Sequence, residues 1–190
     1  LIKRAALSSQ QQLSLITSNL GEKIDNISNY AITLSINSNI ADVLKENPTV
    51  PENTLEHFLV NSELTDQAQR IIGLHKNIYA WDILDTENHW FHSSTTETDQ
   101  LDSILGPEVL DSLQTNLAFQ FLGPFQISGE PTFVALKSIT NIDNTKYLGA
   151  LVLLIRETNI SSAFRDLPDS SSRDFYITDE NGQILSSSSS

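Results

Sequence analysis

The chain has 190 residues and is 39% hydrophobic, which is enough for one cored domain, or for one domain and part of a second. Its formal net charge of -13 repels nucleic-acid phosphates and anionic lipid headgroups, and this argues against a nucleic-acid partner. The sequence contains no cysteine, which excludes a disulfide framework and a zinc–thiolate site.

No signal peptide is visible in the sequence, and the chain begins at Leu1 rather than at Met. We therefore expect it to be a piece of a longer protein. The longest apolar run is Leu148–Ile155, which is too short to cross a bilayer as a helix, since that takes roughly 20 residues. If the parent is a membrane protein, we expect its membrane spans to lie outside this chain.

The N-terminal part of the chain has the pattern of one long helix. Residues 5–45 contain no Pro and a single Gly, and apolar residues recur every seven positions at Leu13, Leu20, Ile27 and Leu34. The second apolar row of a coiled coil is interrupted, because Ile16 is followed at the same spacing by Lys23, Tyr30 and Asn37. This predicts a straight helix whose C-terminal half packs on the core. The pattern fits a helix that only packs on the domain core, and it also fits a helix whose N-terminal half forms a weak homodimer.

A second helix is predicted after Pro51, ending near Gly73. Its expected apolar side contains Leu55, Phe58, Leu59, Leu64, Ala68, Ile71 and Ile72. A hairpin follows, with strands at 78–84 and 90–92 and a turn at 85–88. Residues 95–117 return to helical spacing with a break at Gly106-Pro107, and such a long polar excursion is typical of a lid.

Three further strands are predicted in the second half of the chain. Phe119–Phe121 opens one that bends at Gly123-Pro124, and residues 132–140 and 147–155 form the other two. The short loop between 132–140 and 147–155 requires antiparallel pairing, since a parallel crossover needs about a dozen residues or more. Residues 147–155 are apolar on both faces, which indicates a central, covered strand.

A short helix and a last hairpin complete the predicted order. The helix is expected to begin at Asn159 or Ser161, to contain Ile160, Phe164 and Leu167, and to stop at Pro168, and the hairpin covers 175–187. This order predicts an α+β domain with a long N-terminal helix packed on a PAS-like antiparallel sheet of about five strands.

Several segments, taken in order, resemble the extracytoplasmic Cache sensor domain, a PAS-like module of bacterial sensor histidine kinases and chemoreceptors. These segments are NIYAWDILDTENHWFHSS at 77–94, LGPF at 122–125, PTFVALKSIT at 131–140 and KYLGALVLLIRETNISSAF at 146–164. The last segment, FYITDENGQILSS at 175–187, resembles the hairpin that opens the next module in double-Cache proteins. The resemblance implies a stalk helix at 1–48, a membrane-distal sensor module at 49–168 and a truncated second module at 169–190.

In function, the resemblance implies the extracellular ligand-sensing input domain of a transmembrane two-component histidine kinase, without cofactor or catalysis of its own. It places the domain on the outer side of the cell membrane, with a membrane-anchored parent and a small-molecule ligand. A chemoreceptor domain, or a surface protein-interaction module without a pocket, are the alternatives. Two departures matter: His89 stands where the family usually has Gly, and the middle excursion lacks the Trp-Tyr pair that many members place over the ligand. The Arg-x-Trp-Tyr arrangement of amino-acid-binding members is also missing. An amino-acid ligand is therefore not implied.

Motifs that would indicate catalysis or metal binding are missing. The sequence has no Gly-x-Ser-x-Gly elbow and no Gly-rich phosphate loop. His89 and His92 are three apart on a predicted strand, where they face opposite sides and do not share a metal ion. Residues 179–182 begin like a calcium loop, but Ser190 stands where the acidic twelfth ligand is needed, so a simple turn is expected.

An aromatic set is the candidate ligand site. Its members lie on predicted strands, together with one lysine that interrupts an apolar strand: Tyr79, Trp81, Trp90, Phe121, Phe133 and Lys137. Aromatic residues at a spacing of two also fill ordinary cores, and both interpretations stay open. In the pocket interpretation, the ligand lies between the sheet face of Tyr79 or Trp81 and the excursion 95–118, with Lys137 at the rim.

Overall fold

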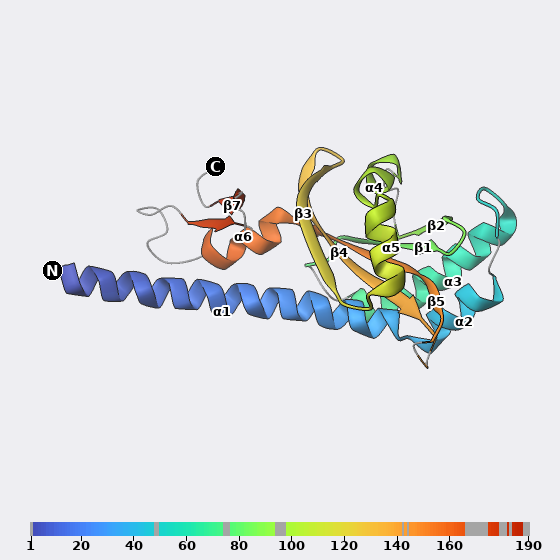
Figure 1. Cartoon of the computed structure of the whole chain (residues 1–190), viewed down its shortest axis with the longest axis horizontal. Coiled ribbons are helices and arrows are strands. Elements are labelled where there is room, and N and C mark those ends of the chain that lie inside the picture. Colours follow the sequence, from blue (N-terminus) through green and yellow to red (C-terminus); the bar gives the residue numbers. More distant parts are fainter. Residues whose placement is uncertain are drawn as a thin grey trace.

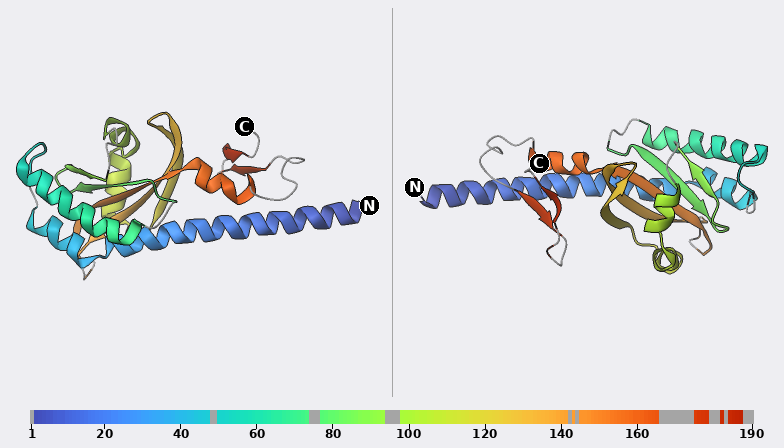
Figure 2. Two further views of the ribbon diagram at one scale, coloured as in Figure 1. Left: turned by 180° about the vertical axis from the view of Figure 1, so that it is seen from behind. Right: turned by 90° about the horizontal axis from the view of Figure 1, so that it is seen from above.

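The computed structural model describes residues 2–47, 50–73, 77–93, 98–141, 143, 145–165, 175–178, 182 and 184–187 (Figure 1). Side chains are described within these ranges except at 2–8, 98–99 and 165. A long helix extends beyond a five-stranded sheet, and further helices cover both faces of that sheet (Figures 1 and 2). Within the described residues, no helix is both long enough and apolar enough to cross a membrane.

The predicted N-terminal helix is two helices, α1 (Ile2–Ser35) and α2 (Ser38–Glu46). Asn37 separates them because its backbone is extended, with φ -68° and ψ 119°, and its side chain accepts a hydrogen bond from the N–H of Ile40. An Asn in this conformation caps a new helix rather than continuing the old one. The prediction of one uninterrupted helix over 5–45 is therefore wrong at this position.

Helix α3 (Leu55–Ile72) forms where predicted, but it presents a different face to the core. Val60, Leu64, Ala68 and Ile72 are buried, because a spacing of four places them along one side of the helix. Leu55, Phe58 and Leu59 point away from that side and are 75%, 66% and 58% exposed. The prediction that Leu55, Phe58 and Leu59 lie on the core-facing side of this helix, which rested on their apolar character alone, is therefore wrong.

The sheet confirms the predicted antiparallel architecture. Its five strands lie in the order β2-β1-β5-β4-β3. They are β1 (Ala80–Asp85), β2 (Trp90–His92), β3 (Gln120–Ile127), β4 (Glu130–Thr140) and β5 (Tyr147–Arg156). β4 and β5 pair antiparallel, and β5 is the central strand, as its two apolar faces indicated.

The lid-like excursion folds as α4 (Thr98–Ile104) and α5 (Pro107–Thr115), with the predicted break at Gly106. Helix α6 (Glu157–Arg165) begins directly after β5 and not at the predicted caps. Asn159 instead donates from Nδ2 to the carbonyl of Asn77, and Ser161 donates to Glu157. Ile160 and Phe164 are buried as expected, while 166–168 lie outside the described residues.

The last hairpin pairs β6 (Tyr176–Thr178) with β7 (Ile184–Ser187) as a separate two-stranded sheet. β7 contacts α6 and the strand β3, and Ile177 and Leu185 of the hairpin pack against the core cluster that contains α1 (Figures 1 and 2). The predicted calcium-like turn at 179–182 falls largely outside the described residues.

Two separate cores lie on the two faces of the sheet. Helices α1, α2 and α3 cover one face, where Ile27, Ala31 and Leu34 of α1 pack in one cluster with Trp81 and Ile83 of β1. Helices α4 and α5 cover the other face, in a cluster that contains Leu101, Leu105, Leu113, Leu84, Trp90, Val134 and Leu136. The C-terminal half of α1 therefore lies on the core as predicted, and each strand residue belongs to one face or the other.

Candidate functional site

A buried carboxylate marks the sheet face beneath α4 and α5. Asp82 alternates along β1 with Trp81 and Ile83, so it faces the side of the sheet that Ala80 and Leu84 face. It is fully buried, and its Oδ1 lies 2.7 Å from Nδ1 of His92, its direct partner across the strands. A buried carboxylate needs such a hydrogen bond to offset the loss of hydration.

Asn61 of α3 fixes the edge strand that carries His92. Its Oδ1 accepts the backbone N–H of His92 and its Nδ2 donates to the carbonyl of the same residue. His57 stacks on Phe91 with ring centroids 4.8 Å apart and contacts the carbonyl of Trp90 through Nε2. These side chains occupy the hydrogen-bonding groups that an exposed edge strand would otherwise offer to another chain. β2 is therefore held rigidly from outside the sheet.

The turn between β1 and β2 is organised by Asp85. Its Oδ1 accepts the N–H groups of Glu87 and His89, both at 2.8 Å, and its Oδ2 lies 3.1 Å from Nδ1 of His89. This is a side-chain-mediated turn of the kind Asp favours. His89 and His92 thus pair with different carboxylates, and no group of three metal-type side chains occurs among the described residues.

A cavity of about 360 Å³ lies between this hairpin and the junction of α4 with α5. The hairpin contributes Leu84 and Asn88, and the two helices contribute Asp102, Leu105, Gly106, Pro107 and Leu110. Trp90 connects the two sides, because its Nε1 donates to Oδ1 of Asp102 over 2.9 Å. Apolar walls with a few polar groups, in a volume of this size, are typical of small-molecule sites.

The carboxylate of Asp85 influences a tyrosine beside the apolar cluster that adjoins this cavity. Tyr147 packs against that cluster, and its pKa is raised to about 12 by burial and, second, by the charge of Asp85. Burial disfavours the phenolate because it removes hydration, and the nearby carboxylate repels it. The phenol of Tyr147 is therefore neutral in the folded protein at any physiological pH.

We expect this raised pKa to make folding stability fall at alkaline pH. The ordinary pKa of Tyr is 10.0 and that of folded Tyr147 is about 12, so its contribution is complete below pH 10 and is lost as the pH rises toward 12. Two pKa units correspond to a loss of at most about 2.7 kcal/mol. Urea unfolding at pH 9 and pH 11.5 should show a smaller alkaline loss in Tyr147→Phe than in the wild type. Equal losses in both proteins would contradict this role.

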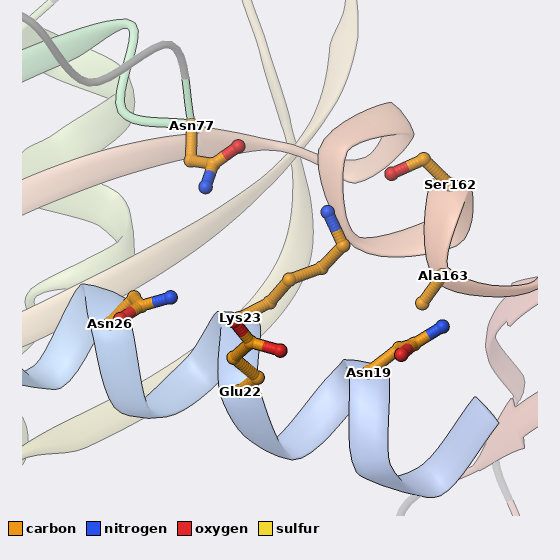
Figure 3. A pocket seen from close by; sticks show the side chains of 7 residues that line it. All are labelled: Asn19, Glu22, Lys23, Asn26, Asn77, Ser162 and Ala163. Carbon is orange, nitrogen blue, oxygen red and sulfur yellow. The ribbon is translucent and has the colours of Figure 1, made fainter. Parts of the chain in front are cut away.

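Two other hollows are less suited to a small molecule. The cleft in Figure 3, of about 420 Å³, separates α1 from α6 and is lined mainly by polar groups: Asn19, Glu22, Lys23, Asn26, Asn77, Ser162 and Ala163. A hollow of about 480 Å³ at the outer edge of β2 is lined in part by His57, Asn61 and Glu52. These three side chains already bond the backbone of β2. The cavity beneath α4 and α5 is therefore the candidate site.

The structure does not gather the predicted ligand residues around one pocket. Trp81, Phe121 and Phe133 pack in the cluster beneath α1, α2 and α3, and Phe121 stacks on Phe133 at 5.1 Å. Trp90 alone faces α4 and α5. The predicted pocket between the Trp81 face and the excursion 95–118 is wrong in its geometry, because these two lie on opposite sides of the sheet. The ligand-binding role of the six residues stays a prediction: Trp90 bonds Asp102 of the candidate cavity, whereas Tyr79 and Trp81 line a smaller hollow of about 230 Å³.

Tyr79 and Lys137 lie at the margins of the sheet. Tyr79 precedes β1, is 38% exposed, and holds the guanidinium of Arg156 5.0 Å from its ring centroid. Lys137 is half-buried, and its Nζ donates to the carbonyl of Leu117 at the end of the excursion. Burial lowers the pKa of Lys137 below its usual value. Neither residue lines the candidate cavity.

The sequence led us to interpret the excursion as a lid, but it did not single out Asn88, Asp102, Leu105 or Leu110 as cavity residues. A signal for Leu105 was present, because Leu101 and Leu105 are four apart and both are buried on the sheet. Asp102 then follows Leu101 at the mouth of the cavity. No local pattern marks Asn88, which reaches the cavity through the left-handed turn conformation with φ 66°.

Comparison with known proteins gives matches to solved structures only. No family model matches the sequence, and no curated protein matches it. The sensor domain of the V. cholerae histidine kinase DctB matches with 16% identity and a TM-score of 0.67, covering 99% of this chain and 69% of that one. The ligand-binding domain of the Campylobacter jejuni chemoreceptor Tlp3, in complex with L-valine, matches with 13% identity and a TM-score of 0.66, covering 98% and 73%. The corresponding domain of the Pseudomonas fluorescens chemoreceptor CtaA, in complex with L-serine, matches with 12% identity and a TM-score of 0.62, covering 96% and 72%. At such low identities the likeness shows the fold.

Proposed function

Because the chain has the fold of Cache-type sensory domains, we propose that it is the extracytoplasmic ligand-sensing input domain of a membrane-anchored receptor. A two-component histidine kinase is the first choice for the parent, and the likeness to the DctB sensor domain supports it. The observation that carries the proposal is the cavity between the β1–β2 hairpin and the α4–α5 junction. The domain itself binds and does not catalyse.

The two faces of β1 give this proposal a mechanism. Leu84 on one face lines the cavity, whereas Trp81 and Ile83 on the other face pack in the cluster that contains α1. A ligand that contacts both the hairpin and the α4–α5 roof favours a closed arrangement of the two. A ligand changes the equilibrium only through contacts that differ between open and closed states. A shift of β1 on closure would reach α1 through the cluster on the second face, where α1 contacts the neighbouring strands β5 and β4.

We further propose that residues 1–48 are the stalk, 49–168 the sensing module and 169–190 the start of a second module. Supporting this, α1 extends beyond the sheet, and the hairpin β6–β7 forms a two-stranded sheet of its own (Figure 1). Leu13 of the extended part, which belongs to the seven-residue apolar row, is 55% exposed, which suits a weak homodimer through α1. Sedimentation velocity over a range of concentrations should detect association that Leu13→Glu abolishes; a monomer throughout would exclude it.

Ligand-dependent stabilisation tests the main proposal. In a screen of metabolites, a true ligand at a hundredfold excess over its Kd should stabilise the domain by about 2.7 kcal/mol. Leu110→Trp should abolish this effect, because Leu110 is half-buried in the cavity wall and the larger ring fills the space. Leu117→Trp is the matched control, since Leu117 is exposed and lies outside the cavity. Stabilisation that survives Leu110→Trp would place the ligand elsewhere.

A chemoreceptor domain is the second candidate, and the likeness to the Tlp3 and CtaA domains favours it. The two candidates differ in the parent's output and share the same site. If no small molecule stabilises the domain, a protein-interaction module remains. The exposed Leu55, Phe58 and Leu59 of α3 would then be its first candidate surface.

A further inference from the structure

We infer that the ligand of the cavity beneath α4 and α5 is a small organic cation, an amine that carries no carboxylate. The inference deepens the proposed sensing function and rests on it, because it assigns a ligand class to the same cavity.

The sequence supplies acids and no permanent cations to this part of the fold. Between Lys76 and Lys137 there is no Lys or Arg, whereas the same stretch contains nine acidic residues: Asp82, Asp85, Glu87, Glu97, Asp99, Asp102, Glu108, Asp111 and Glu130. The stretch includes every residue that lines the cavity. A ligand carboxylate in the cavity would therefore find no ammonium or guanidinium group on the hairpin or on either lid helix.

The histidines of the hairpin do not replace the missing cation. Nδ1 of His92 bonds Asp82, and Nδ1 of His89 bonds Asp85, so each imidazole is balanced by its own carboxylate. Lys137, the next cation along the chain, donates to the carbonyl of Leu117 and does not line the cavity. An anionic ligand would thus meet the carboxylate of Asp102 without a compensating cation in the cavity lining, and such a like-charge contact is unfavourable.

Asp102 is positioned to receive a cation. Its Oδ1 accepts the indole N–H of Trp90, which fixes the carboxylate at the mouth of the cavity. Its Oδ2 has no hydrogen-bond donor among the described residues, so it can accept one from an ammonium group. The side-chain oxygen of Asn88 offers a second, neutral acceptor. Leu84, Leu105 and Leu110 form apolar walls suited to the carbon skeleton of an amine.

These features distinguish the expected ligand from those of similar structures. The Tlp3 and CtaA domains were solved with L-valine and L-serine, each of which has both an ammonium and a carboxylate group. The corresponding amines without the carboxylate are isobutylamine and ethanolamine. Both members of each pair carry the ammonium group, so they differ only in a carboxylate that would meet Asp102 with no cation beside it; the amine should therefore bind at least tenfold more tightly than its amino acid.

The test is calorimetric titration of the 190-residue chain with isobutylamine, ethanolamine, phenethylamine and putrescine, alongside L-valine, L-serine and isobutyrate. At least one amine should bind, and the amino acids and isobutyrate should bind at least tenfold more weakly. Asp102→Asn should weaken amine binding at least tenfold while its amide oxygen still accepts from Trp90. Asp111→Asn is the control, because Asp111 is an exposed acid on α5 outside the cavity. If Asp102→Asn unfolds the domain, Leu110→Trp is the second test, and it should abolish amine binding.

Three results would overturn the inference. In the first, an amino acid or isobutyrate binds as tightly as the amines. In the second, Asp102→Asn and Asp111→Asn change amine affinity equally. In the third, none of the amines binds even at about 10 mM, which corresponds to a very weak Kd. The proposed sensing function fails separately. It fails only if the metabolite screen also finds no molecule whose stabilising effect depends on Leu110. A neutral ligand found in that screen would keep the function and exclude the amine.

Discussion

Trp81→Ala is expected to lower the free energy of unfolding by about 3–5 kcal/mol, the usual cost of truncating a buried tryptophan. Trp81 is 3% exposed and packs in the cluster that joins the sheet to α1, α2 and α3. Removing its ring leaves a cavity in this cluster, which the close packing of the remaining side chains prevents from collapsing fully. Such a loss is a large fraction of the stability of a domain this size.

Phe58→Ala is the matched control for this prediction. Phe58 is also aromatic, but it is 66% exposed on α3, so its truncation should change stability by less than about 0.5 kcal/mol. Urea unfolding followed by far-ultraviolet circular dichroism measures both variants. A Trp81→Ala protein as stable as the wild type would show that Trp81 does not fill the core. It would also restore the prediction that Trp81 binds the ligand in a fold that survives its removal.

The elements of the fold were largely predictable because their signals are local. The seven-residue apolar row of α1, the Gly106-Pro107 break between α4 and α5, and the short loop between β4 and β5 each act within a few residues. The break between α1 and α2 was missed because Asn37 is as compatible with an exposed helix position as with a cap. Only the tertiary packing of α2 decides whether Asn37 continues one helix or caps the next.

The site was harder to predict because both faces of β1 are buried. All six residues of the strand are buried, so alternation separates Trp81 from Leu84 without saying which helices cover which face. Aromatic content drew the prediction toward Trp81, but a buried aromatic face is the mark of a well-packed core. The excursion covers the face of Leu84 instead. The path of α4 and α5 around the sheet, which no local pattern determines, therefore decides the position of the cavity.

The contact that Lys137 makes could not be predicted from the sequence either. Its place in an apolar strand predicted either a solvent-facing ammonium or a ligand contact. The structure gives a third outcome, in which Nζ donates to the carbonyl of Leu117 where the chain leaves α5 for β3. This partner is 20 residues away in sequence. Only the completed fold brings the two together, so neither residue alone could indicate the contact.

Gly149→Ala is expected to destabilise the domain by about 2–5 kcal/mol, through overpacking and backbone strain together. Gly149 lies in the central strand β5 opposite Asp85 of β1, and a Cβ added there would lie 2.5 Å from the carbonyl oxygen of Leu84. Its φ of 157° also lies outside the range that residues with a side chain adopt readily. An alanine must therefore push β1 away from β5.

Gly21→Ala provides a control of opposite sign. Gly21 is exposed in the interior of α1, and a Cβ added there meets no atom within 4 Å. Alanine at this position should stabilise the domain by about 0.5–1 kcal/mol, because glycine loses more backbone freedom in a helix. Urea unfolding of both variants should thus shift the midpoint in opposite directions. Two shifts in the same direction would show that Gly149 is not in close contact with β1.

The Gly149→Ala variant also tests the link between the sheet and the cavity. Leu84, whose carbonyl the new methyl group would strike, contributes its side chain to the cavity wall. A displaced β1 should therefore weaken ligand binding, and denaturant-free titration of the folded fraction measures this separately from stability. Gly21→Ala lies far from β1 along the chain and should leave affinity unchanged. If Gly149→Ala lowers stability but not affinity, the cavity is held by α4 and α5 alone, and β1 does not carry the signal to α1.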